Sequence, residues 1–248
     1  MKNQQHLLKK ILFVYFLLII SVIVLHIVHN IIGYYIDLNN KVNNIILLID
    51  YVISFLSIFI LNRYYIKQKI YTKMKMSKSY IINVFIILYF SYCIYILLSG
   101  NWFTKFSIRY FEMSLGAGIL EEYVFRGIIL PLFIKKLSFG HRLNSAYIMG
   151  IGFSSFLFCI THSLNMLTSN QSIVLTTIQI IFTFFMAVIN AVIYISTLNL
   201  YITIAMHFLW DFISSLNLVY LSNIYQLIFL IFTVIVMLII LITKKNET

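Results

Sequence analysis

The sequence contains little of what makes a protein soluble and little of what lets a chain turn. Charged residues make up 10% of its 248 residues, whereas a soluble domain typically has about 25%. It has one proline and eight glycines. Hydrophobic residues reach 62%, and the mean hydropathy is +0.97. These values exclude an ordinary soluble domain and indicate a membrane protein with several spans.

The apolar residues gather in stretches long enough to cross a bilayer, which takes about 20 residues. Backbone polar groups cannot stay unpaired in lipid, so each span should be a helix. The predicted fold is an all-α bundle of about eight transmembrane helices. We place these spans near residues 11–36, 45–65, 80–99, 110–134, 144–164, 171–196, 199–220 and 224–243, with a tight hairpin between the sixth and the seventh.

Cysteine pairs, repeats and linkers are also missing. The two cysteines, Cys93 and Cys159, lie in separate spans without C-x-x-C spacing, so the sequence indicates neither a disulfide framework nor a thiolate metal site. The basic start of the chain resembles a signal peptide, but no small-residue cleavage site follows, so we expect an uncleaved first span. Residues 1–248 are therefore predicted to form a single membrane domain.

The net charge of +11 would suit a nucleic-acid partner, but the positions of the basic residues argue against one. Fourteen of the 18 lie in the segments that share a side with the N-terminus. This is the positive-inside pattern, so both termini are predicted to be cytoplasmic. The longest basic run, 63–78, can contact anionic head groups, and we interpret it first as a topology signal. The predicted partner is the lipid bilayer and not nucleic acid.

Acids inside the spans are the exception that requires an explanation. Only Glu121, Glu122 and Asp211 lie well within apolar stretches, where a charge is costly and usually functional. On a helix, Glu122 and Arg126 share one face at i, i+4, which favours an ion pair. Glu121 is rotated by about 100° from Glu122 and can meet a different partner. A purely structural ion pair with Glu121 as a bystander is the alternative.

Histidines add two further polar groups to the same predicted bundle. His162 lies toward the outer end of the fifth span. His207 lies in the seventh, with Asp211 one turn later on the same face. His26 and His29 share the first span at i, i+3 and are expected to make interhelical hydrogen bonds rather than to bind metal.

The missing motifs narrow the chemistry. The sequence has no G-x-S-x-G, no H-E-x-x-H and no Gly-rich phosphate loop. Two glutamates, two histidines and an aspartate suit the activation of water for attack on a carbonyl group. Two His and a Glu are also a ligand set of catalytic zinc, so Zn²⁺ held by Glu122, His162 and His207 stays open as an alternative, with a second Glu as base.

The same residues resemble the CPBP family of CAAX-protease and bacteriocin-processing intramembrane proteases, also called Abi. The E-E-x-x-x-R motif is present at Glu121–Arg126, F-x-x-x-H at Phe158–His162, and H-x-x-x-N/D at His207–Asp211. Their order and spacing agree with the family, and residues 105–215 are covered as a catalytic core. The resemblance implies an intramembrane protease, dependent either on a glutamate or on a metal ion.

Residue by residue, the resemblance implies a role for each motif position. Glu121 would activate the attacking water with His162, while Glu122 and Arg126 would shape the site. His207 and Asp211 would hold the oxyanion or an ion. Many members have Asn where this chain has Asp211, and an ionised Asp cannot donate to an oxyanion. This departure favours a metal-binding or His-orienting role for that residue.

The predicted function is the hydrolysis of a peptide, membrane-protein or lipoprotein substrate. The Ile-, Asn-, Lys- and Tyr-rich composition is typical of a low-GC bacterium, which predicts a multi-pass protein of the bacterial cytoplasmic membrane. There the family is associated with peptide maturation, bacteriocin processing and self-immunity, and CAAX prenyl processing is less favoured. The alternatives are acyl transfer in lipoprotein N-terminal modification at the same site, and a non-catalytic membrane immunity or scaffold protein. A partner membrane protein is not identifiable from the chain.

Overall fold

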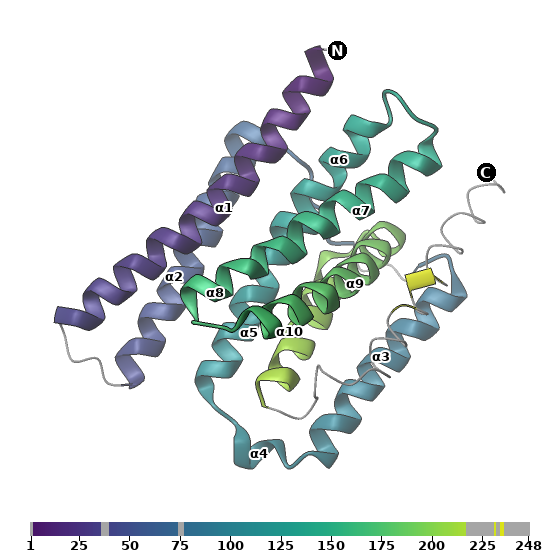
Figure 1. The fold of residues 1–248 in the computed structure, drawn as a ribbon. Coiled ribbons are helices and arrows are strands. Elements are labelled where there is room, and N and C mark those ends of the chain that lie inside the picture. The colour runs from purple at the N-terminus through teal and green to yellow at the C-terminus, as the bar shows by residue number, and fades with distance from the viewer. Residues whose placement is uncertain (1, 36–39, 74–76, 217–230, 232–233, 236–248) are drawn as a thin grey trace.

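The computed structural model describes residues 2–35, 40–73, 77–216, 231 and 234–235. Within these residues the chain is almost entirely helical and contains no β-strand, which confirms the predicted all-α, multi-pass membrane class. Figure 1 shows a bundle of long helices, with α1 and α2 along one edge and α3 along the other. The α-helices are α1 (Lys2–Tyr35), α2 (Asn40–Leu61), α3 (Tyr80–Ser99), α4 (Trp102–Lys105), α5 (Ile108–Glu122), α6 (Leu130–Leu137), α7 (Leu143–Thr161), α8 (Asn165–Thr168), α9 (Ile173–Thr197) and α10 (Leu200–Ser215).

Five of the described helical stretches are long and apolar enough to cross a membrane. They correspond to the predicted first, second, third, fifth and sixth spans. The predicted seventh span is the shorter helix α10, and only residues 231 and 234–235 of the predicted eighth, 224–243, are described. The predicted fourth span, 110–134, is not one uniform helix, since a π-helical segment separates α5 from α6.

This π-helical segment, Tyr123–Ile129, begins directly after Glu122, and all seven of its residues are buried. A wider winding of this kind often marks a functional site. Pro131 follows in the first turn of α6. Proline has no amide hydrogen, so a regular α-helical hydrogen-bond ladder cannot pass through it unbroken. The sequence therefore predicted a helix through these residues but not the local change from α-helical to π-helical winding.

The turn between α9 and α10 confirms the predicted hairpin and is held by the segment that precedes α3. Leu198 adopts a left-handed conformation, with φ of 52°. Its carbonyl oxygen accepts from the Lys73 amide at 3.1 Å, and the Leu200 amide donates to the Tyr71 carbonyl oxygen at 3.1 Å. The basic stretch after α2 is thereby fixed to the end of the α9–α10 hairpin.

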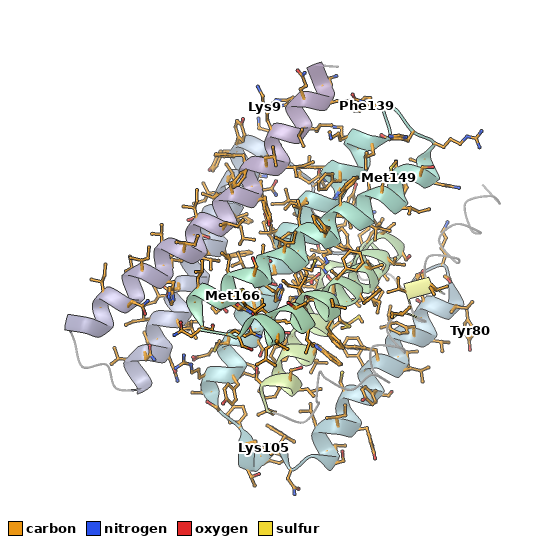
Figure 2. All side chains as sticks on the ribbon, viewed as in Figure 1. Lys9, Tyr80, Lys105, Phe139, Met149 and Met166 are labelled. Atoms are coloured by element: carbon orange, nitrogen blue, oxygen red, sulfur yellow. The ribbon has the colours of Figure 1, made fainter. Side chains whose placement is uncertain are left out.

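The two ends of the bundle carry different segments. In Figure 2, Lys9 and Phe139 lie at the end where the chain begins, and Lys105 lies at the opposite end. This agrees with the predicted alternation of the first five spans. We refer to the end that carries Lys9, the α6–α7 turn and the α9–α10 turn as the basic end. Its cytoplasmic orientation remains a prediction from charge.

Candidate active site

Helix α10 approaches α5 closely enough to bring its histidine beside the two glutamates. A Cβ atom on Gly118 would lie 3.3 Å from the Ile204 carbonyl oxygen and 3.3 Å from the Phe208 amide nitrogen. Small residues allow helix backbones to approach in this way in membranes. The glycine therefore sets the distance across which His207 reaches the acids of α5.

Glu122 and Arg126 form the ion pair that their spacing predicts. Arg126 Nη1 is 3.0 Å from Glu122 Oε1, and both side chains are at most 2% exposed. The Arg126 Nη2 atom donates to the Ala187 carbonyl oxygen at 3.3 Å, and the guanidinium lies 4.4 Å from the centroid of the Phe158 ring. Burial of two charges is tolerated only when each is paired and hydrogen-bonded, and here the contacts come from three helical elements.

His207 is surrounded by three carboxylates. Its Nδ1 atom is 2.9 Å from Glu122 Oε1, and its Nε2 atom is 3.1 Å from Asp211 Oδ2. Glu121 Oε2 is 3.8 Å from the same Nε2 atom. The two closer carboxylates fix both ring nitrogens, so the imidazole cannot rotate without breaking a contact. Glu121 stands at the edge of this group, and its buried Oε2 atom has no hydrogen-bond partner among the described residues.

Asn190 is a member of this cluster that the sequence analysis did not select. Its Nδ2 atom donates to Glu122 Oε1 at 3.2 Å from the middle of α9, and the side chain is buried. An asparagine within a 25-residue apolar helix is costly in lipid unless it is hydrogen-bonded. Its position in such a helix was the sequence feature that could have identified Asn190. Glu122 Oε1 is thus contacted by Arg126, His207 and Asn190 together.

His162 lies at the point where α7 ends and a short 3₁₀ segment, His162–Leu164, begins. Its Nδ1 atom is 3.3 Å from the Phe158 carbonyl oxygen, a contact that a protonated Nδ1 makes as donor and that leaves Nε2 as the basic nitrogen. The Phe158 ring lies 5.1 Å from the His162 ring and 5.7 Å from the His207 ring, between centroids. Phe158 therefore spaces the two histidines.

Two adjoining cavities receive these side chains. One, of about 350 Å³, is lined by Arg126, His207 and Asn190 among others. The second, of about 510 Å³, is lined by Glu121. The two cavities adjoin each other, because six residues line both of them: Tyr51, Met113, Ala117, His162, Gln179 and Asp211.

The second cavity also gives the site a direction. It continues past His26 and Asn30 of α1, Arg109 at the start of α5 and Ser169 after α8. These residues belong to the second half of α1, the first turn of α5 and the segment after α8, which lie away from the basic end in Figure 1. The candidate site therefore connects with the end of the bundle where α1 ends and α2 begins.

Tyr51 is the second residue that motif reasoning missed, since α2 carries none of the motifs. A Cβ atom on Gly116 would lie 2.5 Å from Cγ of the Tyr51 ring, so this ring lies directly on the backbone of α5. It contacts both cavities, and no hydrogen bond of its hydroxyl group is formed with the described part of the chain. Its phenol group is a neutral hydrogen-bond donor for a substrate in these cavities.

The zinc alternative can be tested against this arrangement. Glu122 Oε1 and both nitrogens of His207 are already contacted by protein groups, and His162 Nδ1 lies against a carbonyl oxygen. Within residues 2–35, 40–73 and 77–216, no three His, Cys, Asp or Glu side chains are grouped so that they could hold a metal ion. Glu122, His162 and His207 as placed do not form a ready zinc site.

Comparison with known proteins supports the resemblance seen in the motifs. Residues 103–213 match the family model described as type II CAAX prenyl endopeptidase Rce1-like. This match runs from α4 into α10 and contains all six of the predicted site residues. Neither the curated proteins nor the solved structures that were searched contain a match to this chain.

Proposed function

Because residues 103–213 match the family model of Rce1-like CAAX endopeptidases, we propose that this multi-pass membrane protein hydrolyses a peptide bond of a membrane-embedded substrate. One observation carries the proposal. The buried Glu121 Oε2 atom lacks a hydrogen-bond partner among the described residues, and the Glu121 side chain lines a cavity that His162 also lines. A carboxylate and an imidazole beside one cavity are suited to removing a proton from water.

The proposed reaction uses these two groups. Glu121 removes one proton from a water molecule, and the water oxygen forms a bond with the substrate carbonyl carbon. The carbonyl π electrons move to its oxygen. As the tetrahedral species collapses, the C–N bond breaks, and the proton held by Glu121 passes to the leaving amine. His162 accepts a hydrogen bond from the same water at Nε2 and orients it.

The negative charge on the former carbonyl oxygen needs donors. Both ring nitrogens of His207 are held by the carboxylates of Glu122 and Asp211, so His207 positions these groups and does not donate to this oxygen. Asp211 as a carboxylate cannot donate, so its role is to orient His207 through the 3.1 Å contact. Tyr51 lines both cavities, and its hydroxyl group is the proposed donor to this oxygen, from outside the matched core.

The direction of the cavity bears on the class of substrate. It connects with the end opposite the basic end, and the charge pattern predicts that the basic end is cytoplasmic. A cytosolic protein with a prenylated C-terminus would approach from the wrong side. We therefore favour a peptide or membrane-protein segment reached from the outer half of a bacterial cytoplasmic membrane, as in peptide maturation or bacteriocin processing.

The proposal is tested in a host that lacks the protein, with the wild type and the Glu121→Gln variant expressed at equal membrane levels. Glu112→Gln is the matched control, because it is the same substitution on the same helix and Glu112 lines neither cavity. Membrane peptides and lipoproteins are compared by mass spectrometry. Peptide termini that appear with the wild type and Glu112→Gln but vanish with Glu121→Gln are the expected result.

Two other results would contradict the proposal. A changed lipoprotein acyl mass without new peptide termini would identify a transferase at the same site. If the wild type and Glu121→Gln both differ from the host without the protein in the same way, the carboxylate is structural and the protein acts as a scaffold.

A further inference from the structure

A third cavity lies on the face of α5 that points away from the candidate active site. Its volume is about 930 Å³. Met113, Ala117 and Glu121 face the active-site cavities, whereas Leu115 and Ile119, each two positions along from one of these, line the third one. Two positions on a helix correspond to about 200°, so the cavities lie on opposite faces. The proposed peptidase reaction does not use this third cavity.

The rim of this cavity is cationic. Arg63, Lys67 and Lys69 line it, and all three side chains are exposed. None of them forms an ion pair with a carboxylate of the described residues, and the Lys69 ammonium group lies 5.4 Å from the centroid of the Tyr71 ring. Three unpaired cations around one opening attract an anion.

The cations lie on a segment whose backbone is fixed. The Asn62 side chain accepts from the Gln68 amide at 3.0 Å and donates to the Gln68 carbonyl oxygen at 3.1 Å. The same Nδ2 atom donates to the Tyr123 hydroxyl at 3.1 Å, which ties the segment to the π-helical region. Further along, the segment is bonded to the α9–α10 turn, as described above. A fixed backbone reduces the entropy that binding would cost.

The interior of the cavity is apolar and extends along α5 away from the basic end. Leu115 and Ile119 of α5 and Tyr123 at the start of the π-helical segment line it at successive turns, over about 12 Å of helix. Phe55 and Ile204 line it from α2 and α10. The cations stand only at the basic end of the molecule, so one end of the cavity suits an anion and the rest suits a hydrocarbon chain.

We propose that this cavity binds one anionic phospholipid from the leaflet at the basic end. The phosphate group lies among Arg63, Lys67 and Lys69, and one acyl chain lies along the Leu115 and Ile119 side of α5. A free inorganic phosphate does not fit this description, because it would leave the apolar part of the cavity unfilled. The lipid site is independent of the proposed peptidase, since it uses none of its residues.

The test measures lipid retention by the purified full-length protein in detergent, using native mass spectrometry. Phosphatidylglycerol and phosphatidylcholine with identical acyl chains compete for the protein. We expect the wild type to retain phosphatidylglycerol about tenfold better, which is about 1.4 kcal/mol. Arg63→Gln, Lys67→Gln and Lys69→Gln combined should remove this preference. The matched control combines Lys135→Gln, Lys136→Gln and Arg142→Gln, which removes the same charge at the same end but outside the cavity, and should keep it.

A separate variant tests the acyl chain. Leu115→Trp fills the apolar part while it keeps all three cations, and it should reduce retention of both lipids severalfold; size-exclusion chromatography verifies that it is folded. Equal loss of preference in the control variant would show attraction by general charge and would overturn the site. Unchanged retention by Leu115→Trp, or equal retention of the two lipids by the wild type, would overturn it as well. Competition by inorganic phosphate at the same concentration as the lipid would indicate a headgroup site alone and would also contradict the proposal.

Discussion

Two groups of charged side chains lie on opposite sides of helix α5 and differ in how their charge is stabilised. On one side of α5, Arg126, Glu122 and His207 are buried and each contacts a partner of opposite charge. On the other side, Arg63 and Lys67 are exposed and form no ion pair with described residues. A charged side chain at bilayer depth is stable only when it is paired with an opposite charge, whereas a charged side chain at the interface stays hydrated. The buried group is thus the one with narrow geometric tolerance, as a catalytic site requires.

The largest expected effect concerns the carboxylate that lies at the edge of the buried group. Glu121→Gln should lower the turnover of a cleaved peptide by about 10² to 10⁴, the usual contribution of a general base. The melting temperature should not fall, because Glu121 forms no hydrogen bond through Oε2. Turnover and thermal unfolding are measured on the same detergent preparation. An activity retained within twofold would remove Glu121 from the mechanism.

Replacing a buried and an exposed arginine by methionine compares the two kinds of charged site directly. Arg126→Met should lower the free energy of unfolding by about 3 to 5 kcal/mol, because it leaves Glu122 buried and unpaired. Arg63→Met, at an exposed position, should change it by less than about 0.5 kcal/mol. Adding Glu122→Gln to Arg126→Met should restore part of the loss. Denaturant unfolding in mixed micelles provides these values, and similar losses for both arginines would refute the comparison.

Asn190 offers an intermediate case, since it is a neutral side chain that supports a buried charge. Asn190→Leu should cost about 1 to 3 kcal/mol, because Glu122 Oε1 loses a donor at a position that water does not reach. Asn144→Leu, at a half-buried position without a hydrogen bond to the described residues, serves as the control and should have little effect. Equal stability of the two variants would show that Asn190 is not part of the buried network.

The smallest expected effect belongs to the donor from outside the motifs. Tyr51→Phe should reduce kcat by about tenfold with little change in KM, because an oxyanion donor acts in the transition state. The variant keeps the ring that packs on Gly116, so folding is preserved. A change in KM alone would assign Tyr51 to substrate binding instead.

Much of this fold could be predicted from composition and hydropathy. In lipid, a helix pairs the backbone N–H and C=O groups within its own segment. The five described spans and the α9–α10 hairpin could therefore be predicted from the apolar runs. The interruption between α5 and α6 did not follow, because periodicity is insensitive to a change from α to π winding. Pro131 was its only sign in the sequence.

For the candidate site, local pairs were predictable and cross-helix partners were not. The i, i+4 spacing indicated Glu122 with Arg126 and His207 with Asp211, and both pairs are in contact. The contact of Glu122 with His207 depends on the approach of α10 at Gly118, which no local pattern reveals. Asn190 and Tyr51 carry no motif, and only the packing of α9 and α2 brings them to the site.

The central claim is that water activated beside Glu121 cleaves a peptide bond, and isotope incorporation tests it most directly. The purified protein is incubated in H₂¹⁸O with a peptide identified from the membrane comparison, and the products are weighed by mass spectrometry. Hydrolysis predicts one ¹⁸O atom in the new carboxyl terminus with the wild type and none above background with Glu121→Gln. A product whose acyl group is joined to an amine, without ¹⁸O, would contradict the account and identify acyl transfer.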